Sequence, residues 1–571
     1  MRTLFFRILY FSILFISIEV FSNDTIKINN NQYFTDNNKL LILSNLDTNT
    51  INSTWQNSKT HILMNELYEF QNSENTIRIG TPYTVYSASQ NVYYTLYFTE
   101  LPIISISTPN VIVDEPDVWG YFKMIEKNQN YLESNIGIQY RGASSQAYPK
   151  KSMEFEFWND TLGTESEDHS LLNMVNTDSW NLQAMYNEPL RIRSKTNNDL
   201  WRMINNLHYQ SEEPEAINGI RMNYVELFMN NSYHGVYCLG EKVNRKQLKL
   251  KKHNGNIKGE LYKGVSWGAS TFTSLPPFNN NIDVWGGFEY KHPKEETDWQ
   301  NIYNLVDFVI NTSDSTFYDN YSSKFDVDNL VDYYIFLNLL RATDNTGKNV
   351  YIAKYNSNSK YFYVPWDLDG TFGIIWDGSN EAITNDLLTN GLYNRLINDC
   401  RPGGFREKLK AKWQALRQNT ITHTSLMNMF NINHNLLNSN GIYQRESLVW
   451  SDFVYNNSAL NYMSNWISNR LTYLDDQFLQ NCPSLLIEEV AKTDKSFKVY
   501  PNPTSEKVFI DSNSGNKFSV DVYNNLGQLV LSDTSKDSKK EINLSNFSNG
   551  TYLFKITDNK QVETHKVILS K

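Results

Sequence analysis

The spacing of apolar side chains changes twice along the chain. Short alternating runs such as Asn91 to Thr99 predict β-strands over the front half. From Thr297 the apolar positions recur every three or four residues, which predicts helices at Trp299 to Ile310 and through Leu330 to Leu340. After Pro483 short alternating runs return. The pattern predicts an α+β fold of two lobes, with a strand-rich front and a helical rear, followed by a C-terminal β-sandwich.

More helices are expected on the same grounds. Asp326 or Asp328 is placed to cap the helix that contains Leu330. One helix is expected within the strand-rich front and four in the helical rear: Pro189 to Asn206, Glu381 to Asn398, Gly404 to Gln418, Ser425 to Leu437, and Ile442 to Phe478.

A predicted β-hairpin carries polar residues at both of its ends. Its strands are Val350 to Lys354 and Tyr361 to Val364. Because a hairpin folds back on itself, the loop that enters it and the loop that leaves it should lie side by side. The side chains expected to converge there are Asp344, Asn349, Asp367 and Asp369.

These residue types suit metal-assisted phosphoryl transfer. Carboxylate and amide oxygens are the hard ligands that Mg²⁺ prefers. The order Asp-x4-Asn, hairpin, Asp also follows the order of parts in kinases, where the first Asp accepts a hydroxyl proton and the other two residues hold metal. Two plainer interpretations stay open. Asp and Asn are common turn residues, and Asp367 to Gly370 (DLDG) is also a fragment of a calcium loop, without its distal Glu.

A second candidate region is the Gly-Ala-Ser-Ser loop between two predicted strands. Its Gly142, Ser144 and Ser145 can offer backbone N–H groups and hydroxyls to phosphate, and Lys150 or Lys151 can add a positive charge. An ordinary hairpin turn followed by a solvated lysine is the alternative. Further on, the strand that ends at Glu241 would present backbone groups to a nucleotide base.

Composition narrows the class of protein. The 571 residues are too many for one core and predict two or three domains. A formal net charge of -10, without a basic run, argues against nucleic acid as a partner. Residues 1–22 resemble a signal peptide, and no later segment predicts a transmembrane helix. The three cysteines show no metal-binding spacing and allow at most one disulfide within the chain.

Four sequence blocks, in order, resemble the CotH family of secreted, atypical protein kinases over Leu101 to about Gln480. They are RGASSQAYPKKS from Arg141, VELFMNNSYHGVYCLGE from Val225, DNTGKN from Asp344 and PWDLDGTFG from Pro365. The resemblance implies ATP-dependent phosphorylation of Ser or Thr on secreted or surface proteins, with Mg²⁺ or alternatively Mn²⁺.

The resemblance also implies roles for single residues. Asp344 falls on the catalytic Asp, and Asn349 and Asp367 fall on metal-binding positions. Asp369 lies in the same motif as Asp367 and is expected to assist in binding the metal. Lys151, or Lys150, falls on the nucleotide-binding Lys. The match is looser around Glu188, where an Asp would be expected.

Residues 497–571 resemble the C-terminal sorting domain of proteins exported by the type IX secretion system. YPNP from Tyr500, NLGQLV from Asn525 and NGTY from Asn549 carry that likeness. It implies passage through the periplasm and outer membrane to the cell surface or medium, with the secretion machinery as a partner. The expected organisation is a signal peptide (1–22), a β-rich region (23–100), a kinase-like domain (101–482), a linker (483–496) and the sorting domain (497–571).

Two other functions stay open. A kinase-like scaffold can catalyse a different transfer, such as adenylylation or glutamylation. The second possibility is a non-catalytic surface or adhesion protein. In that case the aromatic insertion from Gly264 to Gly287 would contact a partner or a glycan.

Overall fold

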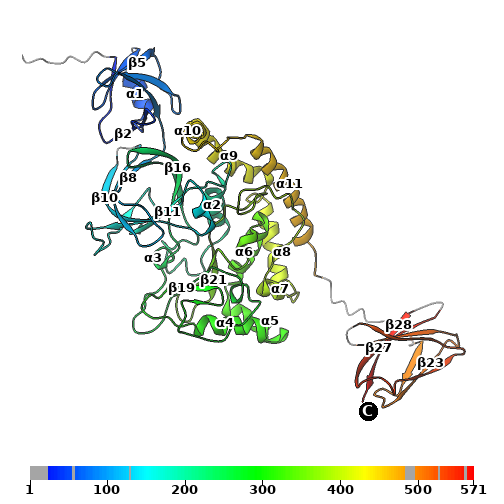
Figure 1. Cartoon of the computed structure of the whole chain (residues 1–571). Coiled ribbons are helices and arrows are strands. Elements are labelled where there is room, and N and C mark those ends of the chain that lie inside the picture. Colours follow the sequence, from blue (N-terminus) through cyan, green and yellow to red (C-terminus); the bar gives the residue numbers. More distant parts are fainter. Residues whose placement is uncertain (1–23, 55–57, 128–129, 483–495, 525–526, 559–561) are drawn as a thin grey trace, which may run out of the picture. The chain divides into compact units, whose positions relative to one another are not determined.

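A computed structural model describes residues 24–54, 58–127, 130–482, 496–524, 527–558 and 562–571 (Figure 1). The chain divides into two compact units, Met1–Cys482 and Pro483–Lys571. The predicted signal peptide and nearly all of the predicted linker lie outside the described residues. Within the described parts, no helix combines the length and the apolar content needed to span a bilayer.

The first unit begins with a mixed seven-stranded sheet in the order β1-β4-β5-β6-β7-β3-β2. Its buried face packs Ile42, Tyr68, Tyr94 and Leu96 into one core, covered by helix α1 (Thr48–Thr54). The strands are β1 (Thr25–Lys27), β2 (Tyr33–Asp36), β3 (Leu41–Ser44), β4 (Lys59–Leu63), β5 (Leu67–Glu74), β6 (Tyr83–Ser87) and β7 (Val92–Phe98).

A closed barrel follows, in the order β10-β11-β14-β16-β15-β8-β9. Burial alternates along its strands, so that Phe155 and Phe157 fill the interior while Glu154 and Glu156 point outward. The strands are β8 (Ile103–Ser107), β9 (Val118–Ile125), β10 (Tyr131–Tyr140), β11 (Met153–Trp158), β14 (Ser179–Gln183), β15 (Met222–Met229) and β16 (Ser232–Gly240); the pair β12 (His169–Ser170) and β13 (Asn176–Thr177) stands beside them.

The predicted hairpin is confirmed and lies at the edge of a second sheet, in the order β18-β19-β17-β20-β21. Strand β20 (Val350–Lys354) pairs antiparallel with β21 (Tyr361–Pro365), and Val350 lies opposite Pro365. The other strands are β17 (Glu260–Gly264), β18 (Val284–Trp285) and β19 (Phe288–His292).

The helical rear confirms the α+β prediction, with corrections to the predicted helices. Helix α6 is capped by Asp326, whose side chain accepts a hydrogen bond from the Asn329 N–H. The helices are α2 (Arg193–Ile204), α3 (Arg245–Leu248), α4 (Gln300–Asn311), α5 (Asp314–Lys324), α6 (Val327–Leu340), α7 (Gly391–Leu396), α8 (Phe405–Arg417), α9 (His423–Ser439), α10 (Ile442–Val449) and α11 (Ser458–Phe478).

Two predicted helices were wrong in extent. The expected helix from Glu381 to Asn398 starts only at Gly391, where the Asn390 side chain caps it. The segment before it is irregular because buried Arg470 binds its carbonyl oxygens, among them those of Thr384 and Asp386. The expected continuous stretch from Ile442 is two helices, interrupted after Val449.

Buried charges on α10 connect the helical rear to the barrel. The Arg445 guanidinium donates to both carboxylate oxygens of Glu226 on β15, at 2.9 and 2.7 Å. Glu446 accepts from the Lys150 ammonium at 2.9 Å and from the Val236 N–H at 2.7 Å. All four charged side chains are fully buried, so each needs its partner in place.

The second unit is a β-sandwich whose two sheets share one core, including Val508, Val520 and Phe554. Its sheets have the orders β22-β23-β26 and β25-β24-β27-β28. The strands are β22 (Phe497–Tyr500), β23 (Lys507–Ser512), β24 (Ser519–Tyr523), β25 (Leu529–Thr534), β26 (Lys539–Asn543), β27 (Gly550–Thr557) and β28 (Val562–Leu569).

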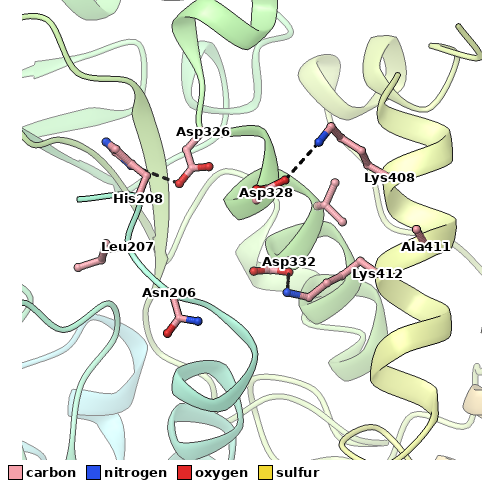
Figure 2. A pocket seen from close by; sticks show the side chains of 10 residues that line it. Asn206, Leu207, His208, Asp326, Asp328, Asp332, Lys408, Ala411 and Lys412 are labelled. Carbon is pink, nitrogen blue, oxygen red and sulfur yellow. Dashed lines mark hydrogen bonds and ion pairs between the residues drawn. The ribbon is translucent and has the colours of Figure 1, made fainter. Parts of the chain in front are cut away.

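A polar cavity of about 550 Å³ lies between the start of α6 and helix α8 (Figure 2). Asp328 pairs with Lys408 at 3.5 Å, and Asp332 pairs with Lys412 at 2.7 Å. The side chain of Asp332 is almost completely buried, and burial raises its pKa to about 6, although Lys412 opposes the shift.

We expect Asp332 to make the first unit less stable as the pH rises from about 4 to 6. The unfolded carboxyl has a pKa near 3.9, so in that range the folded chain holds a proton that the unfolded chain has lost, and stability falls with pH. The loss should reach about 3 kcal/mol at most, because a shift of one pKa unit corresponds to about 1.4 kcal/mol.

Urea unfolding of wild type and Asp332→Asn at pH 4 and pH 7 measures the effect. Asn keeps the hydrogen bond from Asn205 but cannot ionise, so the variant should gain stability relative to wild type at pH 7. Asp328→Asn is the control, since the Asp328 side chain is 85% exposed. Equal pH dependence in wild type and Asp332→Asn would contradict the interpretation.

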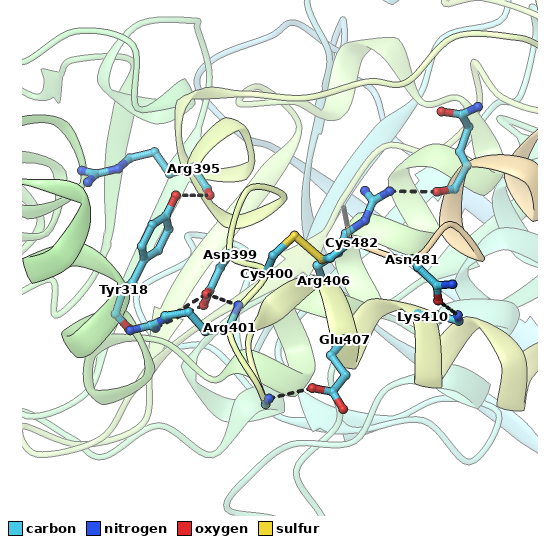
Figure 3. The surroundings of a disulfide bond; sticks show 12 residues. Tyr318, Arg395, Asp399, Cys400, Arg401, Arg406, Glu407, Lys410, Asn481 and Cys482 are labelled. Atoms are coloured by element: carbon cyan, nitrogen blue, oxygen red, sulfur yellow. Dashed lines mark hydrogen bonds and ion pairs between the residues drawn. A yellow bond between two sulfur atoms is a disulfide. The ribbon is translucent and has the colours of Figure 1, made fainter. Parts of the chain in front are cut away.

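One disulfide joins the end of α7 to the end of α11, and it links Cys400 to Cys482 across 82 residues of sequence (Figure 3). Beside it Arg401 pairs with Asp399 at 2.8 Å, and Lys410 donates to Asn481 at 2.6 Å. The third cysteine, Cys238, is a buried free thiol, and burial raises its pKa to about 12. The bridge therefore closes the helical rear at the last residue of the first unit.

We expect loss of this bridge to lower the free energy of unfolding by about 2–4 kcal/mol, because it closes a long loop. Cys400→Ser, Cys482→Ser and the double variant should show the same loss in chemical denaturation, and reductant should destabilise only the wild type. Cys238→Ser is the control and should keep its sensitivity to reductant. A double variant with twice the loss of either single variant would show that the two sulfurs are not joined.

Candidate functional site

A single amide joins the two ends of the hairpin. The Nδ2 group of Asn345 donates to the carbonyl oxygen of Asn349 at 2.8 Å and to that of Trp366 at 2.7 Å. The Trp366 N–H donates to the same Asn349 carbonyl at 3.1 Å. The loop that holds Asp344 and the loop that holds Asp367 therefore start from one hydrogen-bonded cluster.

Two of the candidate residues have left-handed backbones. Asn349 has φ +53° and Asp367 has φ +56°. Asn and Asp adopt this region more readily than other residues with a side chain, but at a cost, and such backbones recur at functional sites. The entry loop is also held close, since the Asn349 N–H donates to the Gly264 carbonyl at 3.0 Å. A Cβ on Gly264 would lie only 2.1 Å from the Gly347 oxygen, so glycine is required there.

Asp344 stands at the entry of the hairpin and remains partly exposed. Its carboxylate accepts from the Asn349 Nδ2 group at 3.2 Å and lies 3.7 Å from the Lys348 ammonium. A carboxylate in this position can orient a hydroxyl group and accept its proton.

Helix α2 holds the exit loop from behind. Asn197 donates to the Leu368 carbonyl and to the Thr371 hydroxyl, both at 2.8 Å. Arg193 donates to the Thr371 carbonyl at 3.0 Å and pairs with buried Glu188 at 2.6 Å. Glu188 therefore supports the loop through Arg193, whereas neither lysine of the second candidate region is bonded to it.

Asp367 borders a small cavity between the exit loop and the barrel. The cavity is lined by Arg141, Asn181, Gln183, Asn198, Ile220, Met222, Gly240, Trp366, Asp367 and Leu368. The Arg141 guanidinium lies over the Trp366 ring, 5.2 Å from its centroid. A cation of the barrel is thus held beside the candidate carboxylate.

The Gly-Ala-Ser-Ser loop directly follows Arg141. Gly142 has φ +107°, and a Cβ there would lie 2.0 Å from the Ser145 hydroxyl. Ser144 and Ser145 begin a short 3₁₀ turn, Ser144–Ala147. Tyr148 ends this loop, and burial together with the charges of Asp377 and Asp369 raises its pKa.

The two candidate lysines have different surroundings. Lys150 is fully buried and bonded to Glu446 and to the Val236 carbonyl, and burial lowers its pKa to about 8. Lys151 is half-buried, donates to the carbonyl groups of Gln146 and Tyr148, and lines a different cavity of about 290 Å³. Neither is among the residues that line the cavity beside Asp367.

The other two candidates are also engaged by neighbours. The Glu241 side chain is buried, pairs with Arg221 at 2.6 Å and accepts from the Val175 N–H at 2.7 Å. Asp369 accepts from Asn187 at 3.1 Å, and desolvation together with the charge of Asp367 raises its pKa well above the usual range. Asp369 thus shares the exit loop with Asp367 but faces Asn187.

The oxygen ligands at the hairpin fit a divalent cation in their chemistry. Among the described residues, the Asp367 carboxylate has no hydrogen-bond or ion-pair partner, which leaves it available to a ligand. No three His, Cys, Asp or Glu side chains within the described parts of the chain form a metal-binding group. A cation here would therefore use amide oxygens, or oxygens of a bound substrate, beside Asp367.

Sequence reasoning missed several residues that build this site. Arg141 was visible as the residue before the glycine loop, and Asn345 as the middle of the Asp-x4-Asn motif. Asn181, Asn197 and Asn198 carried no sequence signal, because an Asn in a strand or helix is usually a surface residue.

Comparison with known proteins gives two family matches. Residues 138–474, more than half of the chain, match the family described as CotH kinase protein. Residues 498–570 match the secretion system C-terminal sorting domain. An ulvan lyase of Nonlabens ulvanivorans is 28% identical over 134 residues, which is 23% of this chain. The match spans only 24% of the length of that lyase.

We expect Lys150 and Lys151 to differ sharply on substitution. Lys150→Met removes one of the two cations that pair with the buried Glu446 carboxylate and leaves Arg191, whose Nε lies 3.3 Å from it. The substitution should lower the free energy of unfolding by about 2–3 kcal/mol, the contribution of a hydrogen bond to a charged group. Lys151→Met, the matched control, should cost about 1 kcal/mol, since it removes only hydrogen bonds to loop carbonyls. Thermal and urea unfolding measure both. A Lys150→Met protein as stable as wild type would show that the pair is not structural.

Proposed function

The chain belongs to the CotH kinase protein family, and from that premise we propose that it is an exported, ATP- and Mg²⁺-dependent protein kinase acting on Ser or Thr of secreted or surface proteins. The observation that carries the proposal is the Asn345 amide, which binds both ends of the hairpin and so brings the loops of Asp344 and Asp367 together.

Asp344 is proposed as the catalytic residue. Its carboxylate would orient the substrate hydroxyl and accept its proton as the hydroxyl oxygen attacks the γ-phosphorus of ATP. The new P–O bond forms on the side opposite the bridging oxygen, whose bond to the γ-phosphorus breaks, and ADP leaves with that electron pair. Lys348 and the Asn349 amide hold the carboxylate in position, so the residue contributes mainly through positioning.

The carboxylate of Asp367 and the amide of Asn349 are proposed to hold the metal. Asp369, in the same loop as Asp367, is proposed to assist them. Bound Mg²⁺ would neutralise the phosphate charge. Asn187 and the Gly370 N–H fix the orientation of the Asp369 carboxylate.

Arg141 and the Gly142 to Ser145 loop are proposed to contact the phosphates. The Trp366 ring holds the Arg141 guanidinium beside Asp367, where it can form hydrogen bonds to phosphate oxygens. Lys151 is the lysine that remains available for a nucleotide, because Lys150 is buried against Glu446. For Glu241 the proposal concerns its backbone, since the carboxylate is paired with Arg221.

The sorting domain indicates that the protein is exported to the cell surface or the medium. The secretion machinery is therefore a partner, and substrates are expected among proteins that follow the same route. We propose that the barrel and the helical rear form the catalytic part, and that the β-sandwich takes no part in the chemistry.

Purified protein incubated with γ-labelled ATP, Mg²⁺ and candidate exported proteins tests the proposal. Wild type should transfer label to Ser or Thr. Asp344→Asn should lose at least about 100-fold in rate, because a positioned base contributes that much, while its nucleotide binding is retained. Asp367→Asn should lose the Mg²⁺-dependent rise in melting temperature that ATP gives the wild type.

Asp319→Asn is the matched control, an exposed carboxylate on α5 paired with Arg401. It should behave as wild type in both assays. Label transfer that survives in Asp344→Asn and Asp367→Asn alike would refute the assignment, and transfer of AMP or glutamate in place of phosphate, read by mass spectrometry, would replace it.

A further inference from the structure

Three of the residues that line the cavity beside Asp367 carry oxygen acceptors that have no hydrogen-bond partner among the described residues. They are the Asp367 carboxylate and the Oδ1 atoms of Asn181 and Asn198. The two asparagines are only 4% and 3% exposed. A buried acceptor without a hydrogen bond costs about 1–3 kcal/mol, so two in one cavity indicate that something else satisfies them.

The amide orientations follow from their other bonds. The Nδ2 group of Asn181 donates to the Glu241 carbonyl at 3.3 Å, and that of Asn198 donates to the Ser194 carbonyl at 2.8 Å. Rotating either amide would place two oxygens against each other. The atoms left without a partner in the cavity are therefore oxygens, and the cavity calls for a cation or a hydrogen-bond donor.

The size of the cavity limits which ligand can occupy it. Its free volume is about 20 Å³, which is enough for one water-sized particle. A nucleobase or a sugar does not fit in that space. The occupant is a single ion or a single water molecule, with the rest of any larger ligand outside.

We propose that Asn198 on α2 and Asn181 on β14 are ligands, with Asp367, of a divalent cation held in this cavity. The three residues come from the barrel, from the helix behind the exit loop and from the exit loop itself. Hard amide and carboxylate oxygens suit Mg²⁺ or Mn²⁺. The proposal that a cation binds here depends only on the oxygen acceptors of these three residues. The proposal that the cation takes part in phosphoryl transfer rests on the proposed function.

The charge balance explains how such a site would work with phosphate. Asp367 brings one negative charge, the amides bring none, and Arg141 on the same wall brings one positive charge. The lining is close to neutral, so the cation is held weakly by the protein alone and more strongly once an anionic phosphate is present.

Mn²⁺ alone, without nucleotide, is the probe, and loss of the free-ion electron paramagnetic resonance signal measures its binding to the full chain. Asn198→Ala and Asn181→Ala should weaken Mn²⁺ binding at least tenfold, since even residues outside the coordination shell typically contribute 10–100-fold. Asn198→Asp should strengthen binding, because it adds a carboxylate at the same place. A gain in affinity cannot arise from misfolding.

Asp199→Ala is the matched control on the same helix, where the partly buried Asp199 pairs with Lys195 and Arg202. It should bind Mn²⁺ as wild type does. Wild type that takes up no Mn²⁺, or affinity that is equal in wild type, Asn198→Ala and Asn198→Asp, would overturn the proposal and leave a buried water in the cavity. If the wild type binds Mn²⁺ through Asn198 but transfers no label, the proposed kinase function is refuted and the proposed cation site is supported.

Discussion

The buried charges of α10 are the constraint on which the first unit depends. Arg445 and Glu446 follow each other in sequence and point into the barrel side of the molecule, where Glu226 and Lys150 meet them. Buried ion pairs add little net stability compared with apolar side chains, but a single charge left alone is very costly. They therefore fix where α10 lies against strands β15 and β16.

That position determines the candidate site. The barrel supplies Arg141 and Asn181, helix α2 supplies Asn198, and the exit loop of the hairpin supplies Asp367. None of these elements carries the site alone, and a shift of the barrel would open the cavity and separate the acceptors. Side chains more than 150 residues apart in sequence thus depend on contacts made elsewhere.

The exit loop is held by polar contacts as well as by its Leu368 and Phe372 side chains, which are buried in the apolar core. Arg193 and Asn197 satisfy the carbonyl groups of Leu368, Thr371 and Phe372 from one helix face. These bonds to neighbouring carbonyl groups help to maintain the left-handed backbone at Asp367, a conformation that persists only where the surrounding structure holds it. The same helix presents Asn198 to the cavity, so support and proposed binding come from one element.

The sequence alone determined the features that depend on local order. The hairpin, the residues at its two ends and the change from strand to helix follow from periodicity and turn residues, and those are properties of neighbours in the chain. The limits of Glu381 to Asn398 were wrong because Arg470, distant in sequence, binds the irregular segment before α7. Only the tertiary structure decided that Lys150 is buried against Glu446, that Arg141 is a cation beside Asp367, and that Asn181 and Asn198 face the same cavity. The reason is that the direction of a side chain depends on the elements packed around it, which the spacing of residues along one strand or helix does not contain.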